Sequence, residues 1–257
     1  MHIPDGFLTT NTWLPAWVVS AGGIGYCVRR TSRLLKERMI PLMGVMAAFI
    51  FAAQMLNFPV MGGTSGHLIG AVFAAILLGP YAAAVVMTVV LIAQCLIFQD
   101  GGLTALGANV LNMAILGPAC GYFIYNIIRR TIKGNAGMIT GAALASWASV
   151  VIAASTCALE LSASGTSPFP VVFPAMVFIH AAIGIGEAVI TCVMVSLVLK
   201  VRPDLIYQKD ARPFGRRDLV FGLAIAAILF LLAPFASKFP DGLERAAKDL
   251  GFAAEVK

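Results

Sequence analysis

Charged residues are scarce in this chain. Asp, Glu, Lys and Arg make up only 12% of its 257 residues, whereas 60% are hydrophobic and the mean hydropathy is +0.90. Soluble domains typically carry about 25% charged residues, because their surfaces must interact with water. The shortage of charge therefore excludes an ordinary soluble domain and predicts an all-α integral membrane protein.

Several sequence motifs are also absent. The chain has no Gly-x-x-x-x-Gly-Lys-Ser/Thr loop to bind nucleotide phosphates, so we do not expect it to hydrolyse ATP itself. It has no His-Glu-x-x-His motif, which an intramembrane zinc protease needs. Its cysteines lie inside apolar stretches without a Cys-x-x-Cys pair, which argues against a disulfide framework or a thiolate metal site. We interpret them as small buried hydrophobic residues: Cys27, Cys95, Cys120, Cys157 and Cys192.

Long apolar runs, in contrast, are abundant. A transmembrane helix needs about 20 mostly apolar residues, and the chain accommodates about seven spans followed by one C-terminal span. The third run is short, which is typical of a broken or re-entrant segment. We divide the chain into a membrane domain, residues 1–209, and a C-terminal module, residues 210–257, that contains the last span and a tail. The predicted spans are 12–28, 39–57, 67–78, 80–98, 105–128, 137–159, 170–199 and 219–236.

The basic residues gather in three loops. Fourteen of the 18 Lys and Arg residues follow the first, fifth and seventh predicted spans, which share one side of the membrane if segment 67–98 crosses twice. The positive-inside rule makes that side cytoplasmic in a bacterial inner membrane. The N-terminus and the loops 58–66, 99–104 and 160–169 then lie on the outer side, where the lack of basic residues favours the arrival of a cation. The net charge of +6 thus reflects topology in a lipid bilayer, and we expect no nucleic-acid partner.

The N-terminus combines three nitrogen donors. The amine of Met1, the backbone nitrogen of His2 and Nδ1 of the His2 ring can close two unstrained chelate rings around one cation. Three nitrogens in one plane suit Ni(II) or a similar late first-row ion. The first residues lack the basic and apolar regions of a cleavable signal peptide, so we expect Met1 to be retained. The alternative is that His2 merely follows the start codon.

His67 is the candidate for the fourth nitrogen. It follows a glycine-rich loop, residues 62–66, that permits close approach of another backbone, and this loop shares the outer side with the N-terminus. A ligating imidazole needs a fixed partner on its second nitrogen, and Ser65, Thr64 or a nearby Asn are candidates for this role. The alternative is a histidine that packs or caps a helix at the membrane interface.

Two further ionisable residues lie within a predicted span. His180 and Glu187 are seven residues apart and therefore fall on nearly the same face of a helix. Ionisable residues inside a membrane are costly and usually functional. Glu187 can orient a ligand, pair across the bundle or neutralise His180 in a buried network. Together with Ser65, these two residues are candidates to orient the metal ligands or to line a metal pathway. Other polar residues expected in the interior, without an assigned role, are Gln54, Asn57, Gln94, Asn109 and Asn112.

Four motifs, taken in order, resemble one protein family. They are Met-His-Ile-Pro-Asp-Gly-Phe at the start, Asn-Phe-Pro-Val-x-Gly-Gly-Thr-Ser-Gly-His ending at His67, Asp-Gly-Gly-Leu-Thr-Ala-Leu-Gly-Ala-Asn ending at Asn109, and His-Ala-Ala-Ile-Gly-Ile-Gly-Glu-Ala from His180. Residues 1–200 thus resemble CbiM/NikM, the substrate-capture (S) components of cobalt and nickel energy-coupling factor (ECF) transporters. The tail, with Pro-Asp-Gly-Leu-Glu from Pro240, resembles the PDGLE module related to CbiN/NikN.

This resemblance implies a helical capture subunit with one additional N-terminal helix relative to vitamin-specific relatives. The transported Ni(II) or Co(II) is expected at the Met1 amine, the His2 amide and ring, and His67. The implied partners are a transmembrane coupling subunit resembling CbiQ/NikQ, ATPases resembling CbiO/NikO, and a small subunit resembling CbiN/NikN. The chain itself is then not an enzyme.

Two functions from other classes stay open at this point. A membrane metallo-enzyme would use His67, His180 and Glu187 around a metal with an open coordination position. A metal sensor would bind the ion without transporting it. Four nitrogen ligands around the metal exclude the enzyme, and loss of metal uptake in cells that lack the chain excludes the sensor. The residues do not choose between nickel and cobalt.

Overall fold

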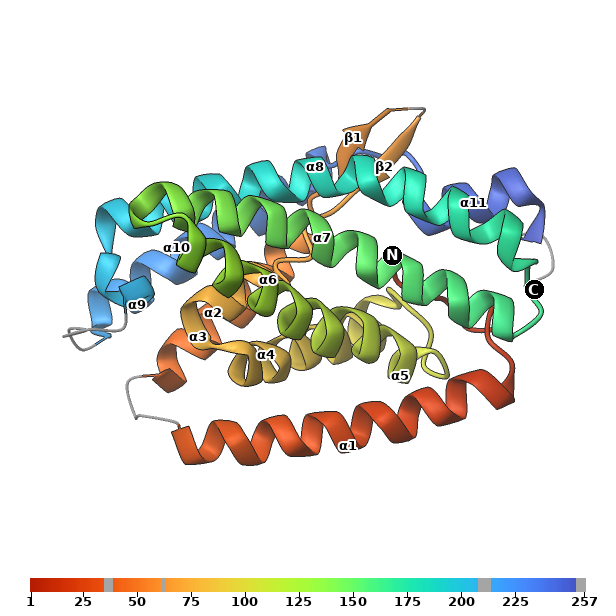
Figure 1. Cartoon of the computed structure of the whole chain (residues 1–257), viewed down its shortest axis with the longest axis horizontal. Coiled ribbons are helices and arrows are strands. Elements are labelled where there is room, and N and C mark those ends of the chain that lie inside the picture. Colours follow the sequence, from red (N-terminus) through yellow and green to blue (C-terminus); the bar gives the residue numbers. More distant parts are fainter. Residues whose placement is uncertain (35–38, 62, 208–213, 253–257) are drawn as a thin grey trace.

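The computed structural model describes residues 1–34, 39–61, 63–207 and 214–252, which form a bundle of helices with one small hairpin (Figure 1). The predicted all-α class is therefore correct. The predicted boundary between the membrane domain and the C-terminal module, at residues 209 and 210, lies outside the described residues. The α-helices are α1 (Thr10–Leu34), α2 (Met39–Gln54), α3 (Ala71–Leu78), α4 (Pro80–Ala93), α5 (Leu106–Asn109), α6 (Gly117–Thr131), α7 (Gly134–Ala163), α8 (Phe169–Val201), α9 (Pro203–Tyr207), α10 (Arg216–Leu232) and α11 (Gly242–Leu250).

Five continuous helical stretches in the described chain are long and apolar enough to cross a membrane. They are Pro80–Phe98, Leu106–Thr131, Gly134–Ala163, Phe169–Val201 and Arg216–Phe235. Each coincides with a predicted span to within a few residues. The predicted first two spans also form helices, α1 and the shorter α2, but these are not among the five, so the count of about seven spans plus one is not confirmed. The predicted short span 67–78 is only eight residues long as a helix.

Two of the stretches contain a π-helical segment. The segment η1 (Gln94–Phe98) continues α4, and η2 (Val110–Leu116) joins α5 to α6. A short 3₁₀ turn, η3 (Ala233–Phe235), ends α10. π-helical turns shift the register of side chains around a helix and are frequent at functional sites. Here both begin beside a buried polar residue, Gln94 in η1 and Asn109 just before η2.

Small residues allow the central helices to approach closely. The helices α7 and α8 pack along much of their length, and α7 also packs against α6. At the α7–α8 contact, a Cβ on Gly184 would lie 2.9 Å from Cδ1 of Trp147, whose indole nitrogen donates a hydrogen bond to the Ala181 carbonyl. The outer helices α1 and α10 pack against α4 and α2, respectively.

A hairpin interrupts the helices between α2 and α3. The strands β1 (Phe58–Val60) and β2 (Thr64–Gly66) pair antiparallel, with Phe58 opposite Gly66. The pairing brings the chain back so that β2 lies against α8 and α11, and His67 follows directly after it. A Cβ on Gly66 would lie 2.6 Å from Cγ2 of Ile183 in α8, so the close approach of β2 to this helix requires a glycine.

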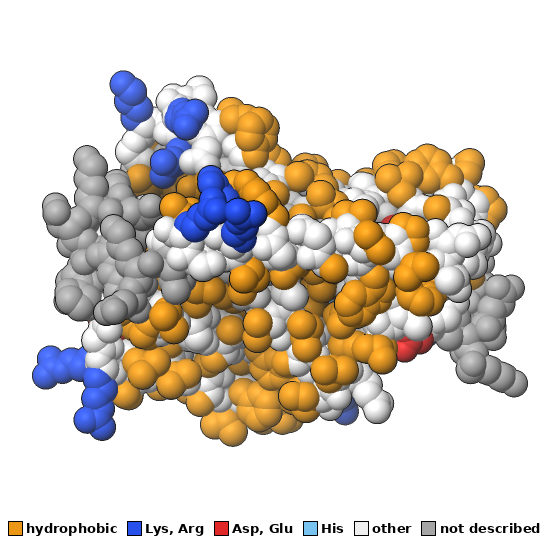
Figure 2. All heavy atoms as spheres, turned by 90° about the horizontal axis from the view of Figure 1, so that it is seen from below, with side chains coloured by type: hydrophobic (Ala, Val, Ile, Leu, Met, Phe, Trp, Pro, Cys, Tyr) orange, Lys and Arg blue, Asp and Glu red, His pale blue; other side chains and the backbone are white. Residues whose placement is uncertain are grey.

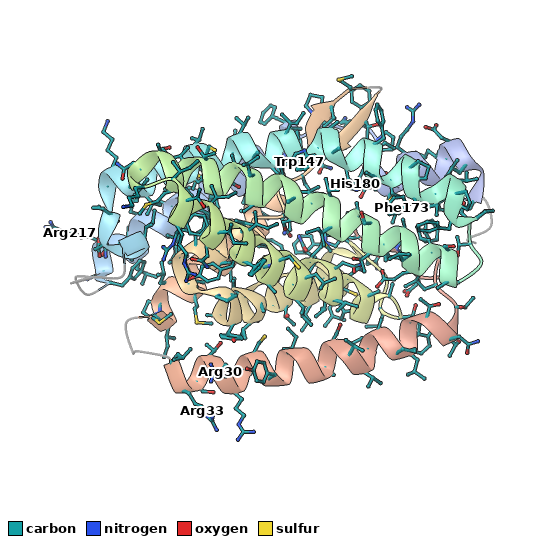
Figure 3. The ribbon with its side chains drawn as sticks, in the orientation of Figure 1. Arg30, Arg33, Trp147, Phe173, His180 and Arg217 are labelled. Atoms are coloured by element: carbon teal, nitrogen blue, oxygen red, sulfur yellow. The ribbon has the colours of Figure 1, made fainter. Side chains whose placement is uncertain are left out.

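The surface separates charge from apolar side chains. Hydrophobic side chains cover the middle of the molecule, and most of the visible Lys and Arg side chains lie toward one end (Figure 2). Arg30, Arg33 and Arg217 mark this end in Figure 3, which agrees with the prediction that the basic loops share one side. The N-terminal segment and the α7–α8 connection lie toward the opposite end (Figure 1). Such an apolar belt is what a bilayer-embedded protein presents to lipid.

Candidate metal centre

The first eight residues run into the bundle instead of along its surface. Ile3 is fully buried, and the exposed fractions of Met1 and His2 are only 5% and 8%. The side chain of Asn109 holds this segment on both edges. The Ile3 N–H donates to its Oδ1 at 2.8 Å, and its Nδ2 donates to the Ile3 carbonyl at 3.1 Å. One side chain thus pairs with both the N–H and the carbonyl of Ile3, main-chain groups that need partners when they are buried.

The Pro-Asp-Gly turn that follows is fixed by the loop before α5. The Asp5 carboxylate accepts hydrogen bonds from the backbone N–H groups of Leu103, at 3.0 Å, and Thr104, at 2.7 Å. The Gly102 N–H donates to the Ile3 carbonyl at 2.9 Å. Only a glycine fits at position 102, because a Cβ there would collide with the Asp5 backbone. The N-terminus and loop 99–104, which were predicted to share one side, therefore lie in direct contact.

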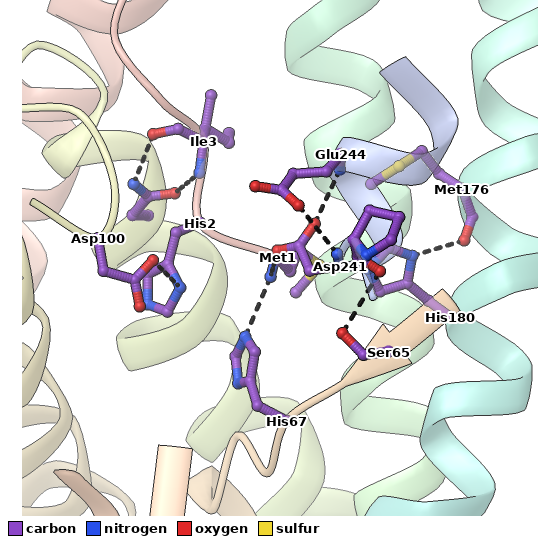
Figure 4. A network of polar contacts seen from close by, with 12 residues as sticks. Met1, His2, Ile3, Ser65, His67, Asp100, Met176, His180, Asp241 and Glu244 are labelled. Carbon is purple, nitrogen blue, oxygen red and sulfur yellow. Dashed lines mark hydrogen bonds and ion pairs between the residues drawn. The ribbon is translucent and has the colours of Figure 1, made fainter. Parts of the chain in front are cut away.

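The amine of Met1 lies between an imidazole and a carboxylate. Its nitrogen is 3.1 Å from Nε2 of His67 and 2.8 Å from Oδ2 of Asp241 (Figure 4). Nδ1 of His67 lies 3.1 Å from the Leu68 carbonyl, which can only accept a hydrogen bond. The proton of the neutral ring therefore belongs on Nδ1, and the lone pair of Nε2 points at the amine.

The hydrogen-bond partner of the His67 ring differs from the predicted one. Ser65 was a candidate partner for the His67 ring, but its hydroxyl donates to the Phe239 carbonyl at 2.7 Å. The ring instead uses the carbonyl of its own neighbour, Leu68, because the chain turns sharply between β2 and α3.

The His2 ring stacks on His67. The two ring centroids are 5.3 Å apart, and the planes differ by 22°. Nδ1 of His2 lies 3.2 Å from Oδ1 of Asp100, and Nε2 lies 3.2 Å from Oε1 of Gln94. A neutral imidazole has one N–H, so only one of these contacts can be a hydrogen bond. In this arrangement Nδ1 faces Asp100 and not the Met1 amine.

A chain of amides presents the Gln94 oxygen to His2. Nε2 of Gln94 donates to Oε1 of Gln54 at 2.7 Å, and Nε2 of Gln54 donates to the Ile69 carbonyl at 2.8 Å. These donations leave Oε1 of Gln94 as an acceptor for the His2 Nε2–H. When that proton occupies Nε2, the lone pair is on Nδ1, which is the nitrogen that a chelate with the amine requires.

Burial keeps both imidazoles neutral. Burial, together with the positive charge of the Met1 amine, lowers the pKa of His2 to about 3 and that of His67 to about 3. Burial alone would oppose ionisation of Asp241 as well, but the charged amine and the hydrogen bonds to this carboxylate outweigh burial and lower its pKa. The pocket therefore holds two neutral nitrogen donors beside a carboxylate.

Glu187 lies behind the His67 segment. Its carboxylate is buried and accepts hydrogen bonds from the backbone N–H groups of Ile69, at 2.6 Å, and Gly70, at 2.8 Å. Gly70 adopts a positive φ of 75° immediately before α3. Glu187 thus fixes the turn after His67. The alternative in which it pairs with His180 is wrong, because the carboxylate is directed to the start of α3.

His180 lines a small cavity beside the amine. Its Nδ1 lies 2.8 Å from the Met176 carbonyl, which places the proton on that nitrogen. Its Nε2 is buried and has no hydrogen-bond partner within the described residues. The cavity wall consists of Met1, Gly66, His67, Ile69, Val150, His180, Ile183, Asp241 and Gly242. Within the described parts of the chain, no group of three or more His, Cys, Asp or Glu side chains is arranged to hold a metal.

The roles of four residues in this site could not be assigned from the sequence. Gln54, Gln94 and Asn109 were expected in the polar interior without an assigned role, and Asn109 also ends one of the four motifs. The signal in each case is a buried amide inside an apolar stretch, which is costly unless its hydrogen bonds are satisfied. In the sequence, Asp241 is marked only as part of the Pro-Asp-Gly-Leu-Glu motif, and its contact with Met1 has no local signal.

Replacing Asn109 by Ala is expected to weaken metal binding by about 10- to 100-fold, the usual effect of losing a residue that orients a ligand. The variant leaves the buried Ile3 N–H and carbonyl without this partner, so the N-terminal segment loses one of its anchors. Equilibrium titration with Ni(II) measures the effect. Asn126→Ala is the matched control, because Asn126 bonds only within its own helix, to Tyr122. Equal affinity of both variants would remove Asn109 from the site.

Comparison with known proteins identifies the family. A family model described as "Cobalt uptake substrate-specific transmembrane region", CbiM, matches residues 2–205. The chain belongs to the CbiM family. This confirms the family expected from the four motifs, and the several apolar helices make this CbiM-family chain a multi-pass membrane protein.

Relatives of this CbiM-family chain are named as transport proteins. A protein of Archaeoglobus fulgidus, provisionally named a fused nickel transport protein NikMN, is 42% identical over 98% of this chain and 83% of its own length. The fused nickel transport protein NikMN of Rhodobacter capsulatus is 35% identical, over 90% of this chain and 71% of its own. The cobalt transport protein CbiM of Geobacter sulfurreducens is 34% identical, over 96% and 73%. The fused relatives align beyond residue 205, in agreement with a C-terminal NikN-like module.

A solved structure has the same fold. A crystal structure of a transition metal transporter superposes with a TM-score of 0.72 at 33% sequence identity, covering 81% of this chain and 97% of that one. Together with the named relatives, this likeness shows a membrane component of nickel or cobalt uptake.

Proposed function

We propose that this chain is the substrate-specific component of an ATP-driven ECF importer. It binds Ni(II) or Co(II) from the outer side of a bacterial inner membrane and delivers the ion across that membrane. The observation that carries the proposal is the buried Met1 amine, 3.1 Å from the lone-pair nitrogen of His67, with the His2 ring stacked on His67. Amine and imidazole nitrogens are donors that late first-row ions prefer.

Four nitrogens are proposed to hold the ion: the Met1 amine, the His2 amide, Nδ1 of His2 and Nε2 of His67. For the ion to bind in this way, the His2 ring has to rotate so that Nδ1 faces the Met1 amine instead of Asp100. Asp100 is half exposed, so its carboxylate can move without leaving a buried charge unpaired. Before it moves, Asp100 offers the arriving cation a negative charge at the outer edge of the site. With four nitrogens bound, the ion has no position for a reacting water, which separates this function from a metallo-enzyme.

Transport needs partners, because the chain has no nucleotide-binding loop of its own. We propose a CbiQ/NikQ-like coupling subunit and CbiO/NikO-like ATPases, whose ATP hydrolysis changes the orientation of this chain and releases the ion inward. The relative of Rhodobacter capsulatus that is named a fused nickel transport protein supports nickel, and that of Geobacter sulfurreducens supports cobalt.

Metal affinity is expected to rise with pH through neutrality. Because the pKa values of His2 and His67 are lowered to about 3, neither ring takes up a second proton near neutral pH, and each keeps the lone pair of one nitrogen free. The protons that compete with the metal are instead those of the Met1 amine and the His2 amide. Up to about two protons are released per ion, so the apparent association constant should rise by up to about 100-fold per pH unit. Titrations at several pH values between about 6 and 8 test this. Affinity that stops rising near pH 7 would implicate imidazole protonation instead.

Two measurements test the function as a whole. Titration of the purified chain with Ni(II), Co(II) and Mg(II) should show one tight site for a late first-row ion and none for Mg(II), which prefers oxygen ligands. Cells that express the chain with its coupling subunit and ATPases should accumulate the metal, and a variant of the ATPases that cannot hydrolyse ATP should prevent this. Tight binding without any effect on uptake would instead indicate a sensor.

A further inference from the structure

The C-terminal segment returns to the metal site after α10. The Ser237 N–H donates to the Asn57 carbonyl at 2.8 Å, and the Ser65 N–H donates to the Pro240 carbonyl at 2.8 Å. The segment therefore runs beside the β1–β2 hairpin and is joined to it by backbone hydrogen bonds. The next helix, α11, packs against α8 and buries its own Leu243, Ala246 and Ala247. We call residues 237–250 the cap.

Asp241 joins the two ends of the chain. Its Oδ1 accepts the Glu244 N–H at 2.8 Å and so caps the first turn of α11. Its Oδ2 accepts a hydrogen bond from the Met1 ammonium at 2.8 Å. The carboxylate is about four-fifths buried, and Met1 is almost completely so. A charged hydrogen bond in such surroundings is stronger than one on the surface.

The next residue, Gly242, forms part of the cavity wall beside His180. A Cβ on Gly242 would lie 2.6 Å from Cε1 and 2.8 Å from Nε2 of His180, so the cap contacts this ring directly and only a glycine fits. Met1, His2 and His67 each have exposed fractions of 8% or less. With the cap in this position, the proposed ligands are largely shielded from solvent, and displacement of the cap would widen the route to them.

We propose that the cap controls the residence time of the metal, and that Asp241 is a positioning residue that holds the Met1 amine beside His67. This inference rests on the proposed function, because it assigns a role at the same site. The contact with Asp241 fixes the position of the Met1 amine. Holding it in place reduces the ordering required when the ion binds. The carboxylate of the closed cap also remains next to the bound cation and so opposes its release.

The Asp241→Asn variant separates the two roles of Asp241. The Asn side-chain oxygen can still accept the hydrogen bond at the N-terminus of α11, because Asn and Asp are comparable N-cap residues. The charged contact with the Met1 amine is lost. Release of bound Ni(II) to excess chelator, followed by its ligand-field absorption, should become about 10-fold faster. The absorption of the bound ion should stay nearly unchanged, because the four nitrogens remain. The control is Asp249→Asn on the same helix, where Asp249 pairs with Arg245 at the surface.

A second variant tests the cap without touching the carboxylate. Ser65→Ala removes the hydrogen bond to the Phe239 carbonyl and should also accelerate release, by a smaller factor. If both variants release Ni(II) at the rate of the unmodified protein, the cap has no influence on residence time. If the unmodified protein binds no Ni(II) or Co(II), the proposed function itself is wrong. The two failures are therefore distinguishable.

Discussion

A chain extended by one residue ahead of Met1 is expected to lose more than about 100-fold in Ni(II) affinity, because losing an outer partner of a ligand alone costs 10- to 100-fold. The extension converts the Met1 amine into an amide, which is no longer a basic donor. It also has to fit where the amine now lies, between Nε2 of His67 and Oδ2 of Asp241. With Met1 only 5% exposed, the extra residue has no space without displacing one of these groups.

The same sample can supply the control for this experiment. A fusion whose removal by a protease leaves Met1 as the first residue should bind weakly before cleavage and tightly afterwards. The thermal stability of the uncut protein shows whether the helices remain folded. Equal affinity before and after cleavage would exclude the amine as a ligand and leave His2 and His67 without the chelate that defines the site.

Helix boundaries could be predicted where the sequence marks them locally. The stretch Pro80–Phe98 coincides with the predicted span because Gly79 has a positive φ of 81° and Pro80 suits the first turn of a helix. The start of α3 was placed four residues too early, at position 67. All eight residues of α3 are buried, so its sequence has no alternation between apolar and polar faces to mark an end.

The candidate site divides in a similar way. Met1 and His2 are adjacent, so their shared chelate follows from covalent geometry, and the proximity of His67 followed from the glycine-rich loop. Their role as metal ligands stays a prediction. Gln94 and Asp241 could not be placed in the same manner, because their partners lie 92 and 240 residues away. In a wholly apolar helix, the sequence does not show which face is directed to the centre of the bundle, because packing decides this. The π-helical segment that begins at Gln94 also shifts the positions of side chains around the helix.

The two buried histidines outside the N-terminus should differ strongly when replaced. His67→Ala is expected to lower Ni(II) affinity by more than about 100-fold, since it removes a ligand and not merely its outer partner. His2→Ala should have a similar effect. His180→Ala is expected to lower affinity by about 10-fold or less, because this ring lines the cavity and contacts the cap at Gly242 but is not one of the proposed ligands.

The spectrum of bound nickel makes this comparison decisive. Loss of one of four nitrogens alters the ligand field, so His67→Ala saturated with excess Ni(II) should show a changed absorption, whereas His180→Ala should keep that of the unmodified protein. Each variant needs an unchanged melting temperature, because both rings are buried beside the same cavity. If His180→Ala abolishes binding while His67→Ala retains it, the ion lies on the His180 and Asp241 side of the cavity. The proposed N-terminal chelate would then be incorrect.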